Sequence, residues 1–139
     1  MHFRYKIEGG DFTNAGSTAS AVKKVLKQLN IDPVIIKRTV VGIYEAEVNI
    51  VAHAYNGVID VDIDENRIFA RFEDAGPGIP DITKAMEEGY STASEIVREM
   101  GFGAGMGLSN IKNNSDKLEI ISQVGKGTTV EITNYFNSK

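Results

Sequence analysis

Hydrophobic and polar residues change their period along the chain, and each change marks the start of an expected element. Residues 2–7 alternate between polar and apolar side chains and predict a strand. Apolar residues then recur at spacings of three and four over residues 21–29, which predicts an amphipathic helix. Asn14 or Ser17 can serve as the N-cap of this helix, because both side chains accept hydrogen bonds from free backbone N–H groups.

The longest helical pattern begins at Asp32 and Pro33. Asp is a favoured N-cap, and proline is favoured at the first helical position. The pattern continues until Gly57, which ends it. An apolar stripe along this helix is expected to carry the core face, and it consists of Val40, Val41, Tyr44, Val48, Val51, Ala52 and Tyr55.

Two β-hairpins are expected in the rest of the chain. Residues 58–64 and 67–73 alternate with a period of two, and so do residues 118–124 and 128–133, with a short turn inside each pair. A helical pattern over residues 106–116 lies between the hairpins. Helices grouped before and between antiparallel hairpins favour an α+β two-layer sandwich, with the helices on one face of a mixed, mostly antiparallel sheet.

Composition and charge narrow the class of protein. The 139 residues are 42% hydrophobic, which is average for a globular protein, so residues 1–139 are expected to form a single domain. Nineteen acidic and fifteen basic residues give a net charge of −4, which argues against direct binding to nucleic acid or to an anionic membrane. The chain has no cysteine, which excludes disulfides and thiolate zinc sites. No apolar run approaches the roughly 18 residues that cross a bilayer, so a cytoplasmic protein is expected.

One polar line on the long helix could carry chemistry. Glu45, Asn49 and His53 are spaced four residues apart, so they lie on one face beside the apolar stripe. A carboxylate and an amide oxygen one turn apart could hold Mg²⁺, which prefers oxygen ligands. A solvated helix edge has the same pattern. Glu47 points away from this line and is expected at the surface.

Two glycine-rich segments offer further candidates. Asp74, Gly76 and Gly78 directly follow a predicted strand, which is typical of a tight turn but also suits a nucleobase pocket with a carboxylate to accept from an exocyclic amine. Residues 101–107 place glycines on alternate positions before a helix, so their backbone N–H groups could surround phosphates, although a flexible loop has the same composition. This loop is no Walker A motif, because neither GKS nor GKT follows it.

The D-x-D-x-D pattern at residues 60–64 resembles the start of a calcium loop. The glycine and the final glutamate that such a loop needs are replaced by Glu65 and Arg71. We therefore expect these aspartates on the solvent face of a strand.

The order of the motifs along the chain is more specific than any single motif. Helix-borne YEAEVNIVAHAY is similar to the N box of the GHKL ATP-binding superfamily, which includes gyrase, MutL and the histidine kinases. FEDAGPGIPD is similar to its G1 box, and GFGAGMGLSNIKN to its G2 box. Within the superfamily, essentially the whole chain resembles the small bacterial branch of anti-sigma factors and serine-protein kinases.

The resemblance implies the Bergerat fold and a role for each matched residue. Glu45 would be the general base, Asn49 the Mg²⁺ ligand, and Asp74 the acceptor for the adenine amine. Residues 89–101 would form a lid over ATP. The other nucleotide contacts would come from Asn49, His53, Gly76, Gly78, Gly103, Gly105, Met106, Gly107, Leu108 and Thr128.

The resemblance also implies a function. The leading expectation is an ATP- and Mg²⁺-dependent serine/threonine kinase whose substrate is a STAS-domain protein of the anti-anti-sigma type, either as an anti-sigma factor or as a stressosome-type switch kinase. The alternative is a nucleotide-gated protein that binds a sigma factor or another regulator with little phosphotransfer. A histidine-kinase module is the weakest alternative, because the only spare phosphoacceptor is His2. Family analogy further implies a homodimer through the sheet or the first strand.

Overall fold

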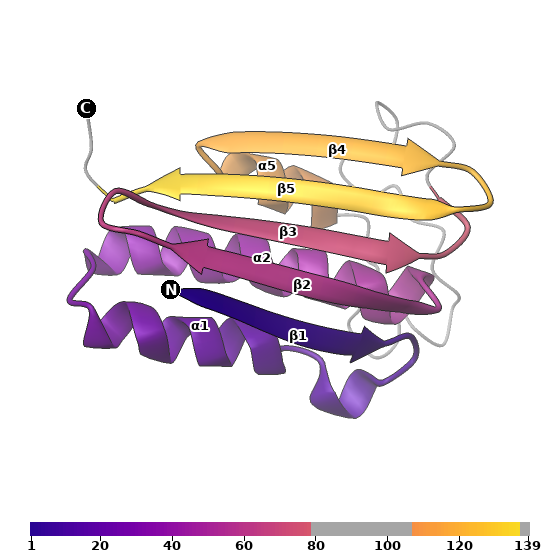
Figure 1. The fold of residues 1–139 in the computed structure, drawn as a ribbon, viewed down its shortest axis with the longest axis horizontal. Coiled ribbons are helices and arrows are strands. Elements are labelled where there is room, and N and C mark those ends of the chain that lie inside the picture. The colour runs from indigo at the N-terminus through magenta and orange to yellow at the C-terminus, as the bar shows by residue number, and fades with distance from the viewer. Residues whose placement is uncertain (79–106, 137–139) are drawn as a thin grey trace.

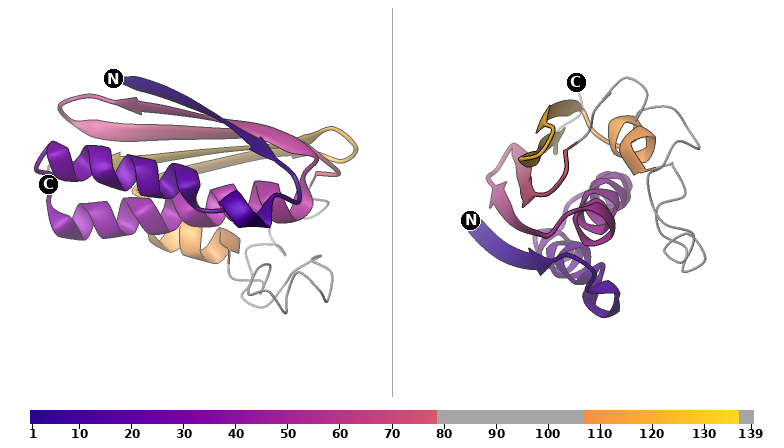
Figure 2. Two further views of the ribbon diagram at one scale, coloured as in Figure 1. Left: turned by 90° about the horizontal axis from the view of Figure 1, so that it is seen from below. Right: turned by 90° about the vertical axis from the view of Figure 1, so that its right-hand side faces the viewer.

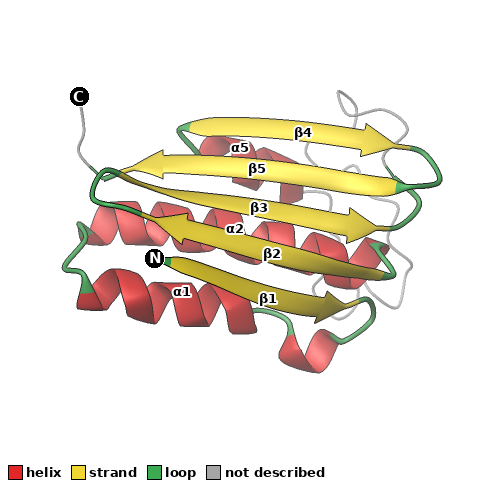
Figure 3. Cartoon of the chain, in the orientation of Figure 1, coloured by secondary structure: helices red, strands yellow, loops and turns green. Residues whose placement is uncertain are grey.

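The computed structural model describes residues 1–78 and 107–136. This part of the chain forms five strands, three α-helices and one 3₁₀ turn (Figures 1 and 3). In chain order they are β1 (His2–Glu8), η1 (Phe12–Asn14), α1 (Ser17–Gln28), α2 (Pro33–His53), β2 (Asn56–Ile63), β3 (Arg67–Ala75), α5 (Gly107–Asn113), β4 (Lys117–Gln123) and β5 (Gly127–Tyr135). The lid expected at residues 89–101 lies outside the described residues, as do Gly103, Gly105 and Met106.

The strands form one sheet in the order β1-β2-β3-β5-β4, and every neighbouring pair is antiparallel. The α+β sandwich is therefore confirmed, but the described sheet is antiparallel throughout and not mixed. The reason is in the connections. β2 and β3, like β4 and β5, are joined by tight turns, while α1 and α2 between β1 and β2 run along the sheet in opposite directions (Figure 1). The chain thus re-enters the sheet at the end where β1 stopped.

All three helices cover the same face of the sheet (Figure 2). The core between the layers is apolar, and a fully buried side chain of this kind contributes about 1.5–3 kcal/mol to stability. Its most buried members include Val22, Leu26, Ile43, Ile50, Ile59, Val61, Phe72 and Ile111. On the opposite face of β2, Asp60 pairs with Arg4 at 2.8 Å and Asp62 with His2 at 2.7 Å. The expectation that these aspartates face solvent is confirmed.

The buried face of α2 differs from the predicted stripe. Val48 and Val51 are buried, but Tyr44 is 39% exposed and Tyr55 is 72% exposed. The expectation that this helix continues until Gly57 is wrong, because α2 ends at His53 and β2 begins at Asn56, so Tyr55 lies between the two. The helix packs against α1 and α5 as well as the sheet, so its buried surface is wider than one stripe. The residues that the helix buries most deeply are Thr39, Ile43, Ala46, Glu47 and Ile50.

The first turn of α1 has no cap from its own segment. Its N-cap is Gly16, whose φ of 96° lies in the left-handed region and which has no side chain to accept a hydrogen bond. The expectation of Asn14 or Ser17 as N-cap is wrong. Asn14 donates to Asp11 at 2.9 Å instead, and Ser17 is already the first helical residue.

The missing cap is supplied from α2 by Glu47. One carboxylate oxygen accepts from the backbone N–H of Thr18 at 3.1 Å, and the other from that of Ala19 at 3.2 Å. Glu47 is 0% exposed, so the expectation that it lies at the surface is wrong. Two residues along an α-helix correspond to a rotation of about 200° around its axis. Glu47 therefore points away from Glu45 and toward α1.

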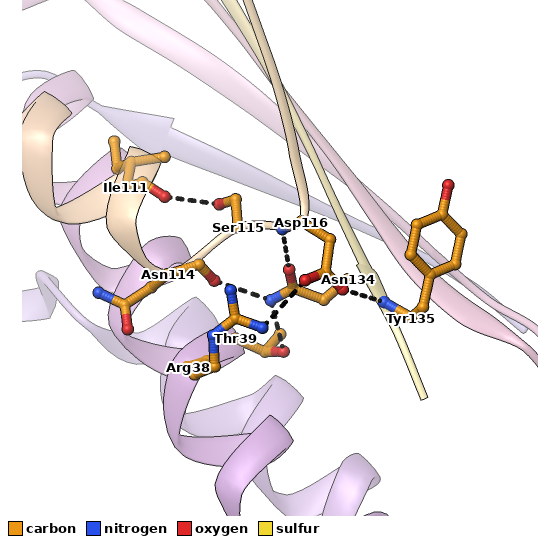
Figure 4. Close-up of polar contacts among 8 residues, drawn as sticks. All are labelled: Arg38, Thr39, Ile111, Asn114, Ser115, Asp116, Asn134 and Tyr135. Atoms are coloured by element: carbon orange, nitrogen blue, oxygen red, sulfur yellow. Dashed lines mark hydrogen bonds and ion pairs between the residues drawn. The ribbon is translucent and has the colours of Figure 1, made fainter. Parts of the chain in front are cut away.

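A second polar cluster joins α2 to the end of α5 and to β5 (Figure 4). We call it the clamp, and it consists of Arg38, Thr39, Asn114, Asp116 and Asn134. The amide of Asn134 accepts from the N–H of Asp116 at 2.8 Å and donates to the Thr39 hydroxyl and the Asn114 carbonyl, both at 3.0 Å. Asp116 in turn pairs with Arg38 at 3.0 Å. The clamp therefore holds the C-terminal end of α5 in place.

Candidate functional site

The described candidate residues gather at one end of the sandwich. The C-terminal half of α2, the end of β3, the start of α5 and the β4–β5 turn meet there (Figure 1). These elements carry Glu45, Asn49, His53, Asp74, Gly76, Gly78, Gly107, Leu108 and Thr128. Segments that lie up to about 80 residues apart in sequence thus contribute to one region.

Glu45 is half-buried on α2 and faces α5. Its Oε1 accepts a hydrogen bond from the side-chain amide of Asn110 at 3.4 Å. Burial raises the pKa of Glu45, and the bond from Asn110 offsets only part of that effect. A carboxylate made more basic in this way is suited to accept a proton.

Asn110 is the residue that sequence reasoning missed. It lies three positions after Gly107, so the two share one face of α5, the face toward the polar line of α2. This helical spacing from the glycine loop was the available signal.

Asn49 lies one turn further along α2, against the first residue of α5. A Cβ atom on Gly107 would lie 3.0 Å from Oδ1 of Asn49, so glycine lets the start of α5 approach this amide closely. The described residues contain no group of three or more His, Cys, Asp or Glu side chains placed to hold a metal. One amide oxygen fits Mg²⁺ all the same, because this ion commonly takes few protein ligands and completes its shell with phosphates and water.

Asp74 lies half-buried at the end of β3. Its Oδ1 accepts from the backbone N–H of Thr128 at 3.0 Å, and the Thr128 hydroxyl lies 2.8 Å from that of Ser122. Burial raises the pKa of Asp74, and the Thr128 bond counters part of the shift. The fold thus brings into contact Asp74 and Thr128, two residues expected at the nucleotide site.

The loop after Asp74 is shaped by close backbone approaches. The N–H of Gly76 donates to the carbonyl of Lys126 at 3.2 Å, and a Cβ on Gly76 would lie 3.0 Å from Cα of Ala54. Gly78 has a φ of 78°, and a Cβ there would lie 2.5 Å from the carbonyl oxygen of Gln123. Larger residues would separate these segments, so the glycines hold the loop after Asp74 against Ala54 and the end of β4.

The two remaining candidates lie nearer the interior. His53 is partly buried at the end of α2, and burial lowers its pKa, which favours the neutral imidazole. The side chain of Leu108 is packed in the hydrophobic core. The side chain of Leu108 therefore supports the start of α5 from the core side.

A groove of about 620 Å³ lies on the other side of Glu45, between α2 and the segment formed by η1 and the start of α1. Its lining includes Asn14, Ser17, Ser20, Lys23, Tyr44 and Glu45. Among the candidate site residues that the structure describes, Glu45 alone lines this groove. The carboxylate therefore borders both α5 and the groove.

Comparison with known proteins shows the family to which this fold and these motifs correspond. The model of the histidine kinase-like ATPase domain matches residues 11–134. The chain is 37% identical over 102 residues to the anti-sigma F factor of Thermoanaerobacter pseudethanolicus, covering 70% of this chain and 68% of that protein. It is 35% identical over 115 residues to the serine/threonine-protein kinase RsbT of Bacillus subtilis, covering 78% of this chain and 79% of that protein.

Solved structures agree on the fold. The crystal structure of the RsbU and RsbW domains of a Mycobacterium tuberculosis protein superimposes with a TM-score of 0.64 at 16% identity. The match covers 96% of this chain and 32% of that one, so the chain spans about a third of the solved protein. At this identity the likeness concerns the fold alone.

In the part of the chain that the structure describes, no helix combines the length and apolar character needed to cross a membrane.

Proposed function

Because the chain belongs to the histidine kinase-like ATPase domain family, we propose that it is an ATP- and Mg²⁺-dependent serine/threonine protein kinase of the partner-switching type, with a STAS-domain regulator as its substrate. One observation carries the proposal beyond ATP binding. Glu45 is a half-buried carboxylate with a raised pKa, one turn from an amide that touches the start of α5. A protein that only bound nucleotide would have no need of such a base.

Nucleotide binding falls to the residues around Asp74. Its carboxylate accepts from the exocyclic amine of adenine, and Gly76 and Gly78 let the ring lie against the backbone. Asn49 supplies an amide oxygen to Mg²⁺, and the bound ion supplies neutralisation of the phosphate charge. The close approach of Gly107 to Asn49 supports this role, because it holds the amide beside the start of α5.

Glu45 acts on the acceptor. The hydroxyl oxygen of a serine or threonine attacks the γ-phosphorus, the bond from that phosphorus to the bridging oxygen breaks, and ADP leaves. The hydroxyl proton passes to the Glu45 carboxylate. The transition state is loose, so the proton moves late and the base contributes orientation as well as basicity.

A second function is favoured by the names of several relatives. Proteins 37% identical to this chain are called anti-sigma F factors. On that basis the chain could be a nucleotide-gated protein that binds a sigma factor or another regulator and transfers little phosphate. The need for the Glu45 carboxylate as a base distinguishes the two functions, since regulator binding requires no proton acceptor.

The test is the substitution Glu45→Gln, which keeps the shape and removes the base. In a transfer assay with radiolabelled ATP and a STAS-domain protein, we expect phosphorylation to fall by about 10²–10⁴, the usual contribution of a positioned base. Nucleotide affinity should be unchanged. Glu119→Gln, on the exposed side of β4, is the matched control and should transfer normally. ATP-dependent binding of the STAS protein by the wild type without any transfer would instead establish the gated-binder function.

A further inference from the structure

Glu47 is a buried carboxylate that the proposed reaction does not use. It is 0% exposed, and none of the ion pairs found in the described part of the chain includes it. A buried carboxylate without a counter-charge is costly unless hydrogen bonds replace the lost water. Here the replacement comes from two backbone N–H groups, those of Thr18 and Ala19, and from the positive end of the α1 dipole.

These two bonds determine where α1 begins. Gly16 offers no side chain as a cap, so Glu47 is the group that satisfies the first turn of the helix. Thr18 and Ala19 lie between Ser17 and Ser20, both of which line the groove beside Glu45. The bonds therefore fix one wall of that groove to α2.

The position of the groove indicates what enters it. Asn49 and the start of α5 lie on one side of Glu45, and the groove lies on the other. In an in-line displacement the attacking oxygen approaches opposite the leaving oxygen. If the phosphates lie against Asn49, the groove gives the acceptor hydroxyl an approach to Glu45 from the opposite side. Hydroxyl groups and one cation at Ser17, Ser20 and Lys23 lie there beside the apolar side chains of Val40 and Val41. This mixed lining suits a loop of a protein, which carries both apolar and hydroxyl side chains.

We propose that Glu47 is a positioning residue for the protein acceptor: by holding the first turn of α1 against α2, it sets the wall along which a serine- or threonine-bearing loop of the acceptor lies. The inference rests on the proposed function for the identity of the reaction. It predicts that Glu47 governs acceptor binding and leaves nucleotide binding alone.

The first experiment compares Glu47→Gln with Val22→Ala, a core truncation on the same helix. Both should destabilise the protein, but only Glu47→Gln should raise the KM for a STAS-domain acceptor, by about tenfold, while the Kd for ATP stays within about twofold. The amides of Thr18 and Ala19 should exchange hydrogen faster in Glu47→Gln than in Val22→Ala. An equal rise of KM in both variants, or none in either, would overturn the inference.

The second experiment avoids the core. Ser20→Tyr fills the groove from an exposed position, and Lys27→Tyr places the same ring on α1 outside it. We expect only Ser20→Tyr to raise the KM for the acceptor, with ATP affinity unchanged in both. An unchanged KM in Ser20→Tyr would show that the acceptor does not bind in the groove. This result would hold whether or not Glu47→Gln folds.

The same variants separate this inference from the proposed function. If the wild type transfers no phosphate but binds the STAS protein when ATP is present, the kinase proposal is wrong. Weaker binding in Glu47→Gln and Ser20→Tyr than in their controls would then still support the groove. Equal binding in all four variants would overturn it, and so would the absence of binding by the wild type.

Discussion

Two polar side chains of α2, Thr39 and Glu45, have opposite kinds of surroundings. In the N-terminal half, Thr39 belongs to the clamp, where Asn134 is 3% exposed and makes three hydrogen bonds of 2.8–3.0 Å. In the C-terminal half, Glu45 has one bond of 3.4 Å among the described residues. Buried polar groups that serve stability are normally fully paired, so the contrast separates a structural cluster from one suited to bind a ligand.

The carboxyl groups show the same contrast. Burial alone would raise the pKa of Asp116, but the N–H of Tyr135 and the guanidinium of Arg38 bring it below its ordinary value. Burial raises the pKa of Glu45 and of Asp74, and one hydrogen bond to each leaves it raised. The fold therefore stabilises the charge of the clamp carboxylate and disfavours the charge of the two site carboxylates.

The largest effect on stability is expected from Asn134→Ala. The change leaves the N–H of Asp116, the hydroxyl of Thr39 and the carbonyl of Asn114 without their partner. Each unpaired buried group costs about 1–3 kcal/mol, and water that enters the space restores part of the lost hydrogen bonding. Denaturant titration should therefore show the free energy of unfolding lowered by about 3 kcal/mol. ATP affinity of the folded variant should stay within about twofold. A large loss of affinity would show that the clamp also shapes the nucleotide site.

Asp74→Ala should affect ATP affinity more than stability, the reverse of Asn134→Ala. Loss of the acceptor for the adenine amine removes a charge-assisted bond, so calorimetry should show ATP binding weakened about tenfold or more. Stability should fall less than in Asn134→Ala, because only one backbone N–H, that of Thr128, loses its partner. Asp62→Ala, on the solvent face of β2, is the control with unchanged affinity. Wild-type affinity in Asp74→Ala would remove Asp74 from the nucleobase site.

Lowering the pH should change the contributions of Asp116 and Asp74 to stability in opposite directions. The folded pKa of Asp116 is below its ordinary value of 3.8, so its stabilisation is present above that value and is lost as the pH falls through the folded pKa. The folded pKa of Asp74 is raised, so its ionised form weakens the fold and protonation on acidification relieves that cost. Denaturant unfolding over about pH 2–6 should therefore show a smaller acid loss for Asp116→Asn and a larger one for Asp74→Asn than for the wild type. Identical slopes would contradict the contrast.

The smallest effect is expected at Thr18. Its hydroxyl is buried and has no hydrogen-bond partner among the described residues, although its backbone N–H is bonded to Glu47. The nearly isosteric change Thr18→Val removes an unsatisfied polar group, so thermal unfolding should show unchanged or slightly higher stability, by less than about 1 kcal/mol. A clear loss would mean that this hydroxyl has a partner in solution.

Local signals were sufficient to predict the order and type of the described helices and strands. Asp32 caps α2 as predicted, with the N–H of Val34 donating to its side chain at 2.8 Å. The period-two segments form the two hairpins. The family model over residues 11–134 confirms the family that the motif order indicated. These features depend on neighbours a few residues away, which is why a sequence pattern can predict them.

Only the tertiary structure decided which polar groups are partners. Glu47 reaches backbone N–H groups 28 and 29 residues away, and Asn134 reaches Thr39 across 95 residues. Asn110 meets Glu45 only because α5 packs along α2. A helical period shows that Glu45 and Glu47 point in different directions, but not which direction another element will cover. That depends on how the helices pack on the sheet, which no local pattern encodes.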